Sequence, residues 1–421
     1  MAAFWPVKQT LAVGELLNLN DVFPRFLLKH LVLVSNNCNF PLSNHPLLSR
    51  EFKASAPGRF QARITFNGVL PLRTVLVDIQ PVLKVYPGGQ AVGVLLHSQG
   101  VIVVGYAEVV SESGSKICPA EQAGLIAGDV IIRIDGKPAA NEQAVKEAIE
   151  RSGTEGRRVS LEVKRSGKVL RFSVTPIFCT RSRTYRIGLL IKDSTAGVGT
   201  LTIYEPVTRV YGALGHMVTD VGKSKPLELA DGRIIEAFIQ GVRPGQRGRP
   251  GEKIGVFTPA SSLSGTIQFN TQYGIFGRLE RIPRHPFFPA PIPVAFAHQV
   301  YTGDAEMITV VDGNRVERFH IEIGRVNTIN RTGKKDVIIR VTDPRLLKLS
   351  GGIIQGMSGS PIIQNGRLVG AVTHVFISNP EKGYGIFAER MVRECGLLPS
   401  KNSFKQSGLV EYLSSKVCCK I

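Results

Sequence analysis

Short runs of β-branched residues that alternate with glycine and proline restrict this chain mainly to β folds. Such runs recur at residues 234–242, 307–311, 337–341 and 368–375, and the sequence holds 44 glycines and 25 prolines but one tryptophan. Frequent turns between short strands are typical of sandwiches and barrels and argue against a helical bundle. With 421 residues, the chain also exceeds one ordinary core and has room for two or three domains.

The charge balance first suggests a nucleic-acid-binding protein. The chain has 52 Lys and Arg against 33 Asp and Glu, a formal net charge of +19. However, it shows no helix-turn-helix pattern, no zinc-ligand spacing and no basic stripe interleaved with aromatic residues. We therefore expect no nucleic-acid partner. The charge fits either a surface drawn to anionic membranes, as in peripheral membrane association, or plain surface composition.

The six cysteines predict neither a disulfide framework nor a metal site. Two of them are the adjacent pair Cys418 and Cys419, and the others are isolated at Cys38, Cys118, Cys179 and Cys395. No C-x-x-C spacing with a second ligand pair exists, so a zinc site is not expected. We predict no metal and no cofactor.

The N-terminal region carries no evident signal peptide or membrane span. It lacks a charged segment followed by an apolar stretch. Its most apolar run, residues 26–34, has about half of the ~20 residues that a spanning helix needs. Residues 1–82 read as a leader or linker region with a few strands.

Residues 83–178 carry the pattern of a small α+β module. Two strand candidates precede a helix that begins at Pro119, an Asp-Gly turn at residues 135–136 and a second helix capped by Asn141. This order, together with the run AGLIAGDVI at residues 123–131, resembles PDZ domains of bacterial proteases. Such domains add an extended peptide to an open sheet edge. The resemblance implies that the peptide-binding strand consists of Gly93, Val94, Leu95 and Leu96.

The segment GMSGSP at residues 356–361 is the sharpest chemical signal. A serine in a tight Gly-x-Ser-Gly turn before an apolar strand is typical of two-barrel serine proteases, so Ser358 is the candidate nucleophile. We expect the amides of Gly356 and Ser358 to form an oxyanion hole. Met357 stands where many digestive proteases have an acidic residue.

A nucleophilic serine needs a base and an acid that orients it. His216 is the best candidate base because it follows a strand run and precedes Ser358, and His374 is the second candidate. Spacing alone does not select the acid. The candidates lie between His216 and Ser358: Asp220, Asp231, Asp304, Asp312, Asp336 and Asp343.

Several segments together resemble the stage IV sporulation protein B family, PDZ-containing serine peptidases of endospore-forming bacteria. They are GALGH at 212–216, VTD at 341–343, GGIIQGMSGSPIIQ at 351–364, AVTHV at 371–375 and GYGI at 383–386. The resemblance implies a trypsin-like double β-barrel over residues 179–399, with His216, Asp343 and Ser358 as catalytic triad. It also implies that Thr373 shapes the substrate cleft. His374 lies on the strand after the nucleophile, and if it is not the base we expect it to line or support the pocket. Residues 400–421 form a tail of unassigned role.

The resemblance further implies an extracytoplasmic protein. Family members act between mother cell and forespore, cleave themselves, and then cleave a membrane-bound regulator of sigma-factor processing. In this chain no leader helix precedes residue 26, which we interpret as a start assigned downstream of the true one. The alternative hypothesis is a catalytically inactive PDZ and protease-like adaptor that binds peptides.

Overall fold

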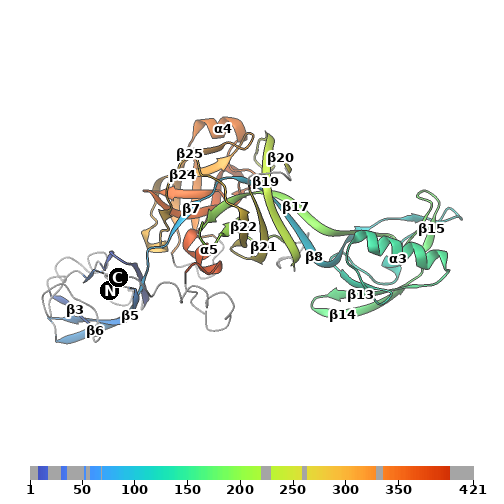
Figure 1. Cartoon of the computed structure of the whole chain (residues 1–421), viewed down its shortest axis with the longest axis horizontal. Coiled ribbons are helices and arrows are strands. Elements are labelled where there is room, and N and C mark those ends of the chain that lie inside the picture. Colours follow the sequence, from blue (N-terminus) through green and yellow to red (C-terminus); the bar gives the residue numbers. More distant parts are fainter. Residues whose placement is uncertain are drawn as a thin grey trace.

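Two six-stranded β barrels make up the centre of the computed structural model (Figure 1). The structure describes residues 8–17, 30–35, 52–53, 57–67, 69–219, 229–257, 263–328 and 335–398. A small sheet lies on one side of the barrels and an α+β arm on the other. The predicted mainly β fold is thus confirmed. The tail at 400–421 lies outside the described residues.

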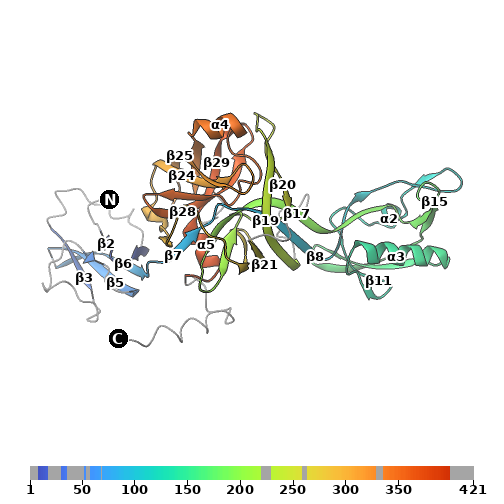
Figure 2. The same cartoon turned by 45° about the horizontal axis from the view of Figure 1, so that its top comes forward.

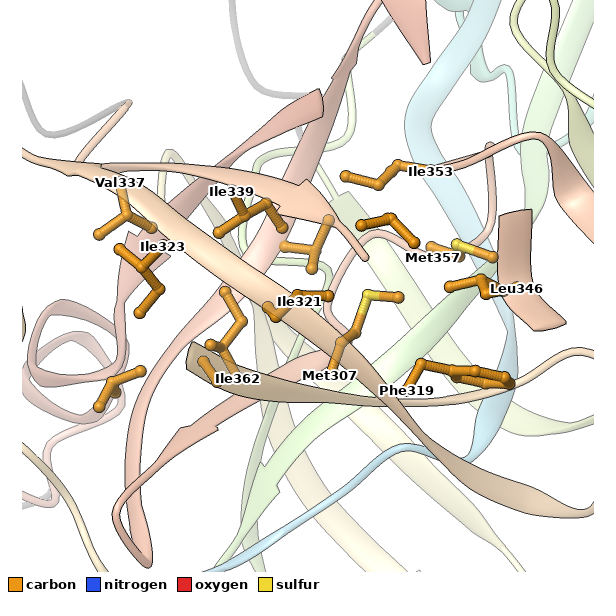
Figure 3. Packing of buried hydrophobic residues seen from close by; sticks show 14 of the residues in the cluster. Met307, Phe319, Ile321, Ile323, Val337, Ile339, Leu346, Ile353, Met357 and Ile362 are labelled. Carbon is orange, nitrogen blue, oxygen red and sulfur yellow. The ribbon is translucent and has the colours of Figure 1, made fainter. Parts of the chain in front are cut away.

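The C-terminal barrel is a closed ring. In spatial order its strands are β24 (Gly303–Val310), β25 (Val316–Val326), β26 (Val337–Val341), β29 (Asn379–Phe387), β28 (Arg367–Phe376) and β27 (Pro361–Gln364). Alternate residues of β25 point inward, as a half-buried strand requires, and Phe319, Ile321 and Ile323 are buried. Figure 3 shows these side chains packed with Met307 and Ile339 in the barrel core.

The N-terminal barrel closes through its two longest strands. Its order is β8 (Ala91–Tyr106), β19 (Leu229–Arg243), β21 (Ser264–Thr271), β22 (Gly274–Arg281), β18 (Val210–Ala213) and β17 (Leu189–Tyr204). The additional pairing of β8 with β17 completes the ring. Its core includes Leu96, Leu201, Tyr211 and Ile234, all of which are buried.

β8 and β17 continue beyond the barrel as a two-stranded ribbon into the α+β arm (Figure 2). They pair antiparallel from Ala91 opposite Thr200 to Tyr106 opposite Leu189. The arm adds α2 (Pro119–Gln122), β11 (Val130–Ile134), α3 (Glu142–Thr154), β13 (Val159–Arg165) and β14 (Lys168–Val174). As predicted, Asn141 caps α3 by accepting the Ala144 N–H at 2.8 Å.

The α+β arm is therefore inserted between two strands of the N-terminal barrel. The sequence analysis assigns all of residues 83–178 to this module. In the structure, residues 92–98 pair with β19 and belong to the barrel. The difference arises because one continuous strand serves both units, and the periodicity of a strand does not show where its partners change.

The N-terminal sheet has the order β1 (Lys8–Ala12), β6 (Leu70–Gln80), β5 (Gly58–Phe66) and β3 (Leu31–Ser35). β7 (Lys84–Pro87) then leads into the barrel, where it pairs with β17. Two short helices, α4 (Pro344–Ser350) and α5 (Ala388–Glu394), belong to the C-terminal region. In the described ranges, every helix is too short or too polar to cross a bilayer.

Candidate active site

A cavity of about 450 Å³ lies between the two barrels and contains the predicted nucleophile and base. The N-terminal barrel and the turn after β18 contribute Val94, Leu96, Leu214 and His216. The C-terminal barrel and its loops contribute Ile354, Gly356, Ser358, Thr373 and His374. Ser358, His216, Thr373 and His374 are thus brought together from segments more than 100 residues apart, as a two-barrel peptidase requires.

Met357 anchors the loop that carries Ser358. Its side chain is fully buried in the core of the C-terminal barrel, close to Leu346 and Ile353 (Figure 3). The Met357 N–H donates to Ile354 O at 3.1 Å, and the Ser360 N–H donates to Met357 O at 2.9 Å. An apolar anchor therefore fixes the loop at the position where many digestive proteases have an acidic residue.

The loop leaves two amides available for an oxyanion. Gly356 has φ +92°, a conformation that favours glycine, and Gly359 has φ +93°. Met357, Gly359 and Ser360 use their N–H groups in hydrogen bonds within the barrel. Among the residues that the structure describes, the N–H groups of Gly356 and Ser358 have no partner. These are the two predicted donors of the oxyanion hole.

Strand β17 of the other barrel holds the same loop. The Thr200 N–H donates to Ser358 O at 2.9 Å, and its hydroxyl donates to Gly356 O at 2.8 Å. The Thr202 hydroxyl donates to Gly359 O at 2.8 Å. Three carbonyls of the nucleophile loop are therefore fixed by one strand of the N-terminal barrel.

His216 is oriented by its own backbone neighbourhood. Leu214 and Gly215, both with φ +69°, form the turn that leads from β18 to the histidine. Nδ1 lies 2.9 Å from Met217 O, so Nδ1 carries the hydrogen and Nε2 is free to accept one. Burial lowers the pKa of His216 below its ordinary value of 6.5, which favours the neutral form that a base needs. The ring centroid of His374 is 4.8 Å away.

Asp343 does not occupy the place that the family resemblance implies. It is the N-cap of α4, where its carboxylate accepts the N–H groups of Arg345 at 2.9 Å and His320 at 3.3 Å. Burial alone would raise its pKa, but these hydrogen bonds outweigh burial and lower the pKa overall. Asp343 is absent from the cavity lining. The sequence held a signal for this role, because an Asp-Pro pair is a common helix start.

The acid that would orient His216 is thus not among the placed residues. Asp231 contacts His97, and Asp336 bonds Arg390. Within the described ranges, no carboxylate bonds His216. Asp220, the candidate nearest in sequence, lies outside the described residues.

The predicted peptide-binding strand Gly93–Leu96 has no free edge. Leu95 lies opposite Ala196 of β17 on one side and opposite Arg233 of β19 on the other. A peptide cannot add to a strand whose two edges are already paired. The assignment of Gly93, Val94, Leu95 and Leu96 to peptide capture is therefore wrong for this fold. Val94 and Leu96 line the catalytic cavity instead.

Sequence reasoning missed Thr200, Thr202 and Lys253, which all contact the nucleophile loop. The two threonines stand two residues apart on β17 and therefore share one face of that strand, but the sequence does not show what packs against this face. Lys253 belongs to a basic Gly-rich stretch that gives no sign of burial.

Two family models match this chain. Residues 183–392 match the model described as SpoIVB peptidase S55, and residues 92–175 match a PDZ domain model. The chain belongs to the SpoIVB peptidase family. It is a serine peptidase with a PDZ domain, as the sequence predicts, and the α+β arm is that domain.

More distant similarities cover parts of the chain. The putative zinc metalloprotease LL2128 of Lactococcus lactis is 35% identical over 105 residues, 24% of either chain, so this chain spans about a quarter of that relative. The Rv3671c protease of M. tuberculosis in its active form is 17% identical, with a TM-score of 0.27, over 48% of this chain and 75% of that one. Its inactive form is 18% identical, with a TM-score of 0.25, over 47% and 84%.

Gly359→Ala should inactivate this SpoIVB peptidase. An added Cβ would lie 2.1 Å from Thr200 O of β17 and 2.5 Å from Leu214 N in the turn after β18, so the loop, the strand or the turn would have to shift. We expect a roughly 100-fold lower rate of serine labelling by a fluorophosphonate, because small displacements of reacting groups cost about that much. Gly241→Ala is the matched control, since an added Cβ there meets no atom within 4 Å. A wild-type rate in Gly359→Ala would show that β17 does not fix the loop.

Proposed function

We propose that Ser358 is the nucleophile and His216 the general base of this SpoIVB-family peptidase. One observation carries the proposal: a single cavity holds both side chains together with the free amides of Gly356 and Ser358. Nucleophile, base and oxyanion donors are the parts that acyl transfer to serine requires.

The proposed reaction follows from these positions. Ser358 Oγ now donates to Thr373 O at 2.8 Å, so its hydrogen has to turn toward His216 Nε2 before attack. His216 then takes this proton as Oγ bonds to the scissile carbonyl carbon. The resulting oxyanion accepts hydrogen bonds from the Gly356 and Ser358 amides. His216 returns the proton to the leaving amine, and water, activated by the same imidazole, releases the acyl group.

We also propose the cellular role that the family resemblance implies. The chain would cleave itself and then a membrane-bound regulator of sigma-factor processing, in the space between mother cell and forespore. Family membership supports this role, and the net charge of +19 supports peripheral association with an anionic membrane. The PDZ domain and peptidase fold fit protein and peptide substrates.

A catalytically inactive adaptor is the second candidate. It is favoured by the hydrogen bond of Ser358 to Thr373 O and by the lack, in the described part of the chain, of a carboxylate on His216. The two functions differ in whether Ser358 is activated.

Fluorophosphonate labelling separates these two functions, because only an activated serine reacts at an appreciable rate. We expect the purified chain to be labelled at Ser358 and to shorten with time, as followed by intact mass spectrometry. Ser358→Ala and His216→Ala should do neither, while Ser360→Ala, the neighbouring buried serine, should still be labelled. If Ser358 is labelled but the mass of the chain does not decrease with time, the peptidase assignment stands and the proposed self-cleavage is contradicted. An unlabelled wild-type chain would favour the adaptor.

A comparison of Asp220→Asn with Asp343→Asn assigns the orienting acid. The contacts of Asp343 predict that Asp343→Asn mainly weakens α4, seen as a lower melting temperature with labelling reduced less than about tenfold. If Asp220 orients His216, Asp220→Asn should lower the labelling rate roughly 10⁴-fold at an unchanged melting temperature, as loss of a triad acid does. The reverse pattern would restore Asp343 to the triad.

A further inference from the structure

Lys253, on β20 (Glu252–Phe257), is a buried cation without an acidic partner. The residue is 5% exposed, and its ammonium donates to Thr309 Oγ1 at 2.8 Å and to Thr200 Oγ1 at 3.5 Å. No carboxylate pairs with it in the described ranges. Burial lowers its pKa to about 7. Burying such a group costs stability, so the fold by itself gives no reason for a lysine here.

The side chain of Lys253 lies against the residue that supplies an oxyanion donor. A Cβ added to Gly356 would lie 3.1 Å from both Cβ and Cδ of Lys253. The backbone N–H of Lys253 also donates to the backbone carbonyl of Gln355 at 2.9 Å. Its ammonium reaches Thr200, whose hydroxyl holds Gly356 O. Lys253 thus touches the Gly356 peptide directly and through Thr200.

A threonine hydroxyl has one hydrogen, so the donors around it decide where that hydrogen points. In its charged form the Lys253 amine has donors only, so it faces a lone pair of Thr200 Oγ1 at 3.5 Å, and the Ser360 hydroxyl donates to the same oxygen at 3.5 Å. The hydroxyl hydrogen of Thr200 is then left to bond Gly356 O. This hydrogen bond fixes the plane of the peptide that follows the Gly356 N–H, one of the two oxyanion donors. Thr309, on β24 of the other barrel, holds the ammonium in place.

We propose that Lys253 is a positioning residue of the peptidase, which sets the oxyanion hole through the Thr200 hydroxyl and the Gly356 peptide. This proposal rests on Ser358 being the nucleophile. It goes beyond that assignment by naming the group that keeps the oxyanion loop in its reactive shape.

Lys253→Met tests the proposal, because methionine keeps an unbranched apolar chain and removes the ammonium. We expect the maximal rate of fluorophosphonate labelling to fall roughly tenfold with an unchanged half-saturating concentration, as for a weakened oxyanion hole. The melting temperature should rise, since an unpaired buried cation is lost. Lys348→Met, at an exposed lysine on α4, is the matched control and should change neither value.

A double-mutant cycle with Thr200→Val adds a readout that a purely structural role would not give. If Lys253 acts through Thr200, the double variant should be labelled no more slowly than Thr200→Val alone. If the losses of labelling rate in Lys253→Met and Thr200→Val add in the double variant, or if Lys253→Met is labelled at the wild-type rate, Lys253 is not a positioning residue. In both cases the wild-type chain is still labelled, so the proposed function stands. A wild-type chain that is not labelled would instead remove the proposed function.

An independent observation concerns the PDZ domain, whose binding edge is covered by the chain itself. Residues 189–192 of β17 pair with residues 102–106 of β8, the strand that continues from the barrel into the domain. β16 (Thr184–Arg186), just before β17, lies along α3, where an added Cβ at Gly153 would lie 2.2 Å from the Tyr185 ring. PDZ domains bind a peptide as an extra strand of their sheet, and residues 189–192 of the chain itself occupy the position of such a strand.

Two hydrogen bonds fix the segment along α3. The Tyr185 N–H donates to Glu150 Oε2 at 2.6 Å near the C-terminal end of the helix. At the other end, the Glu142 N–H donates to Asp193 Oδ2 at 2.8 Å. Residues 184–193 thus cover α3 from one end to the other.

We infer that residues 184–193 act as an internal ligand, so a peptide can bind the PDZ domain only by displacing them. The probe is a fluorescent synthetic peptide with the sequence of residues 184–193, followed by anisotropy. We expect no binding to the wild-type chain and measurable binding to the double variant Tyr185→Ala, Glu150→Gln. The control variant is Tyr301→Ala, which changes an exposed tyrosine just before β24 of the C-terminal barrel and should bind no peptide, like the wild-type chain. Strong binding to the wild-type chain, or none to a double variant with wild-type circular dichroism, would contradict the inference.

Discussion

The hydrogen bonds between β17 and the nucleophile loop are the interaction on which the catalytic geometry depends. Neither barrel holds a complete site, since His216 follows a strand of one and Ser358 precedes a strand of the other. Thr200 and Thr202 join them by donating to three carbonyls of the loop, at Gly356, Ser358 and Gly359. These bonds are buried, where an unmade hydrogen bond is costly, so the N-terminal barrel fixes the loop that carries Ser358, the proposed nucleophile.

The same strand connects the catalytic loop to the PDZ domain. β17 is covered by α3 at its start and holds the loop through Thr200. Its pairing with β8 shifts register between Lys192 and Ser194, at the junction of domain and barrel. Such irregularities bend a strand locally. Asp193 lies in this bend, where its carboxylate accepts the Glu142 N–H of α3 and its carbonyl accepts the Ser98 hydroxyl. The segment along α3 and the threonines that bond the Ser358 loop therefore belong to one continuous strand.

In the role proposed for Lys253, function and stability diverge. An apolar residue would suit its buried position better, and the partners of its ammonium are neutral hydroxyls. Its contacts are to the peptide of Gly356, the proposed oxyanion donor, and an active site is where an enzyme is expected to keep a group that its fold does not require.

The sequence by itself determined the local features. The Gly-x-Ser-Gly turn, the Asn141 cap and the Asp135-Gly136 turn with φ +47° and +76° all depend on residues close in the chain. Only the tertiary structure decided which strand edges are free and which charges are buried. Gly93–Leu96 is paired with β17 on one edge and with β19 on the other, and Lys253 is buried at the junction of the two barrels. Each outcome depends on contacts with residues that are far away in the sequence, and the local sequence does not show which residues these are.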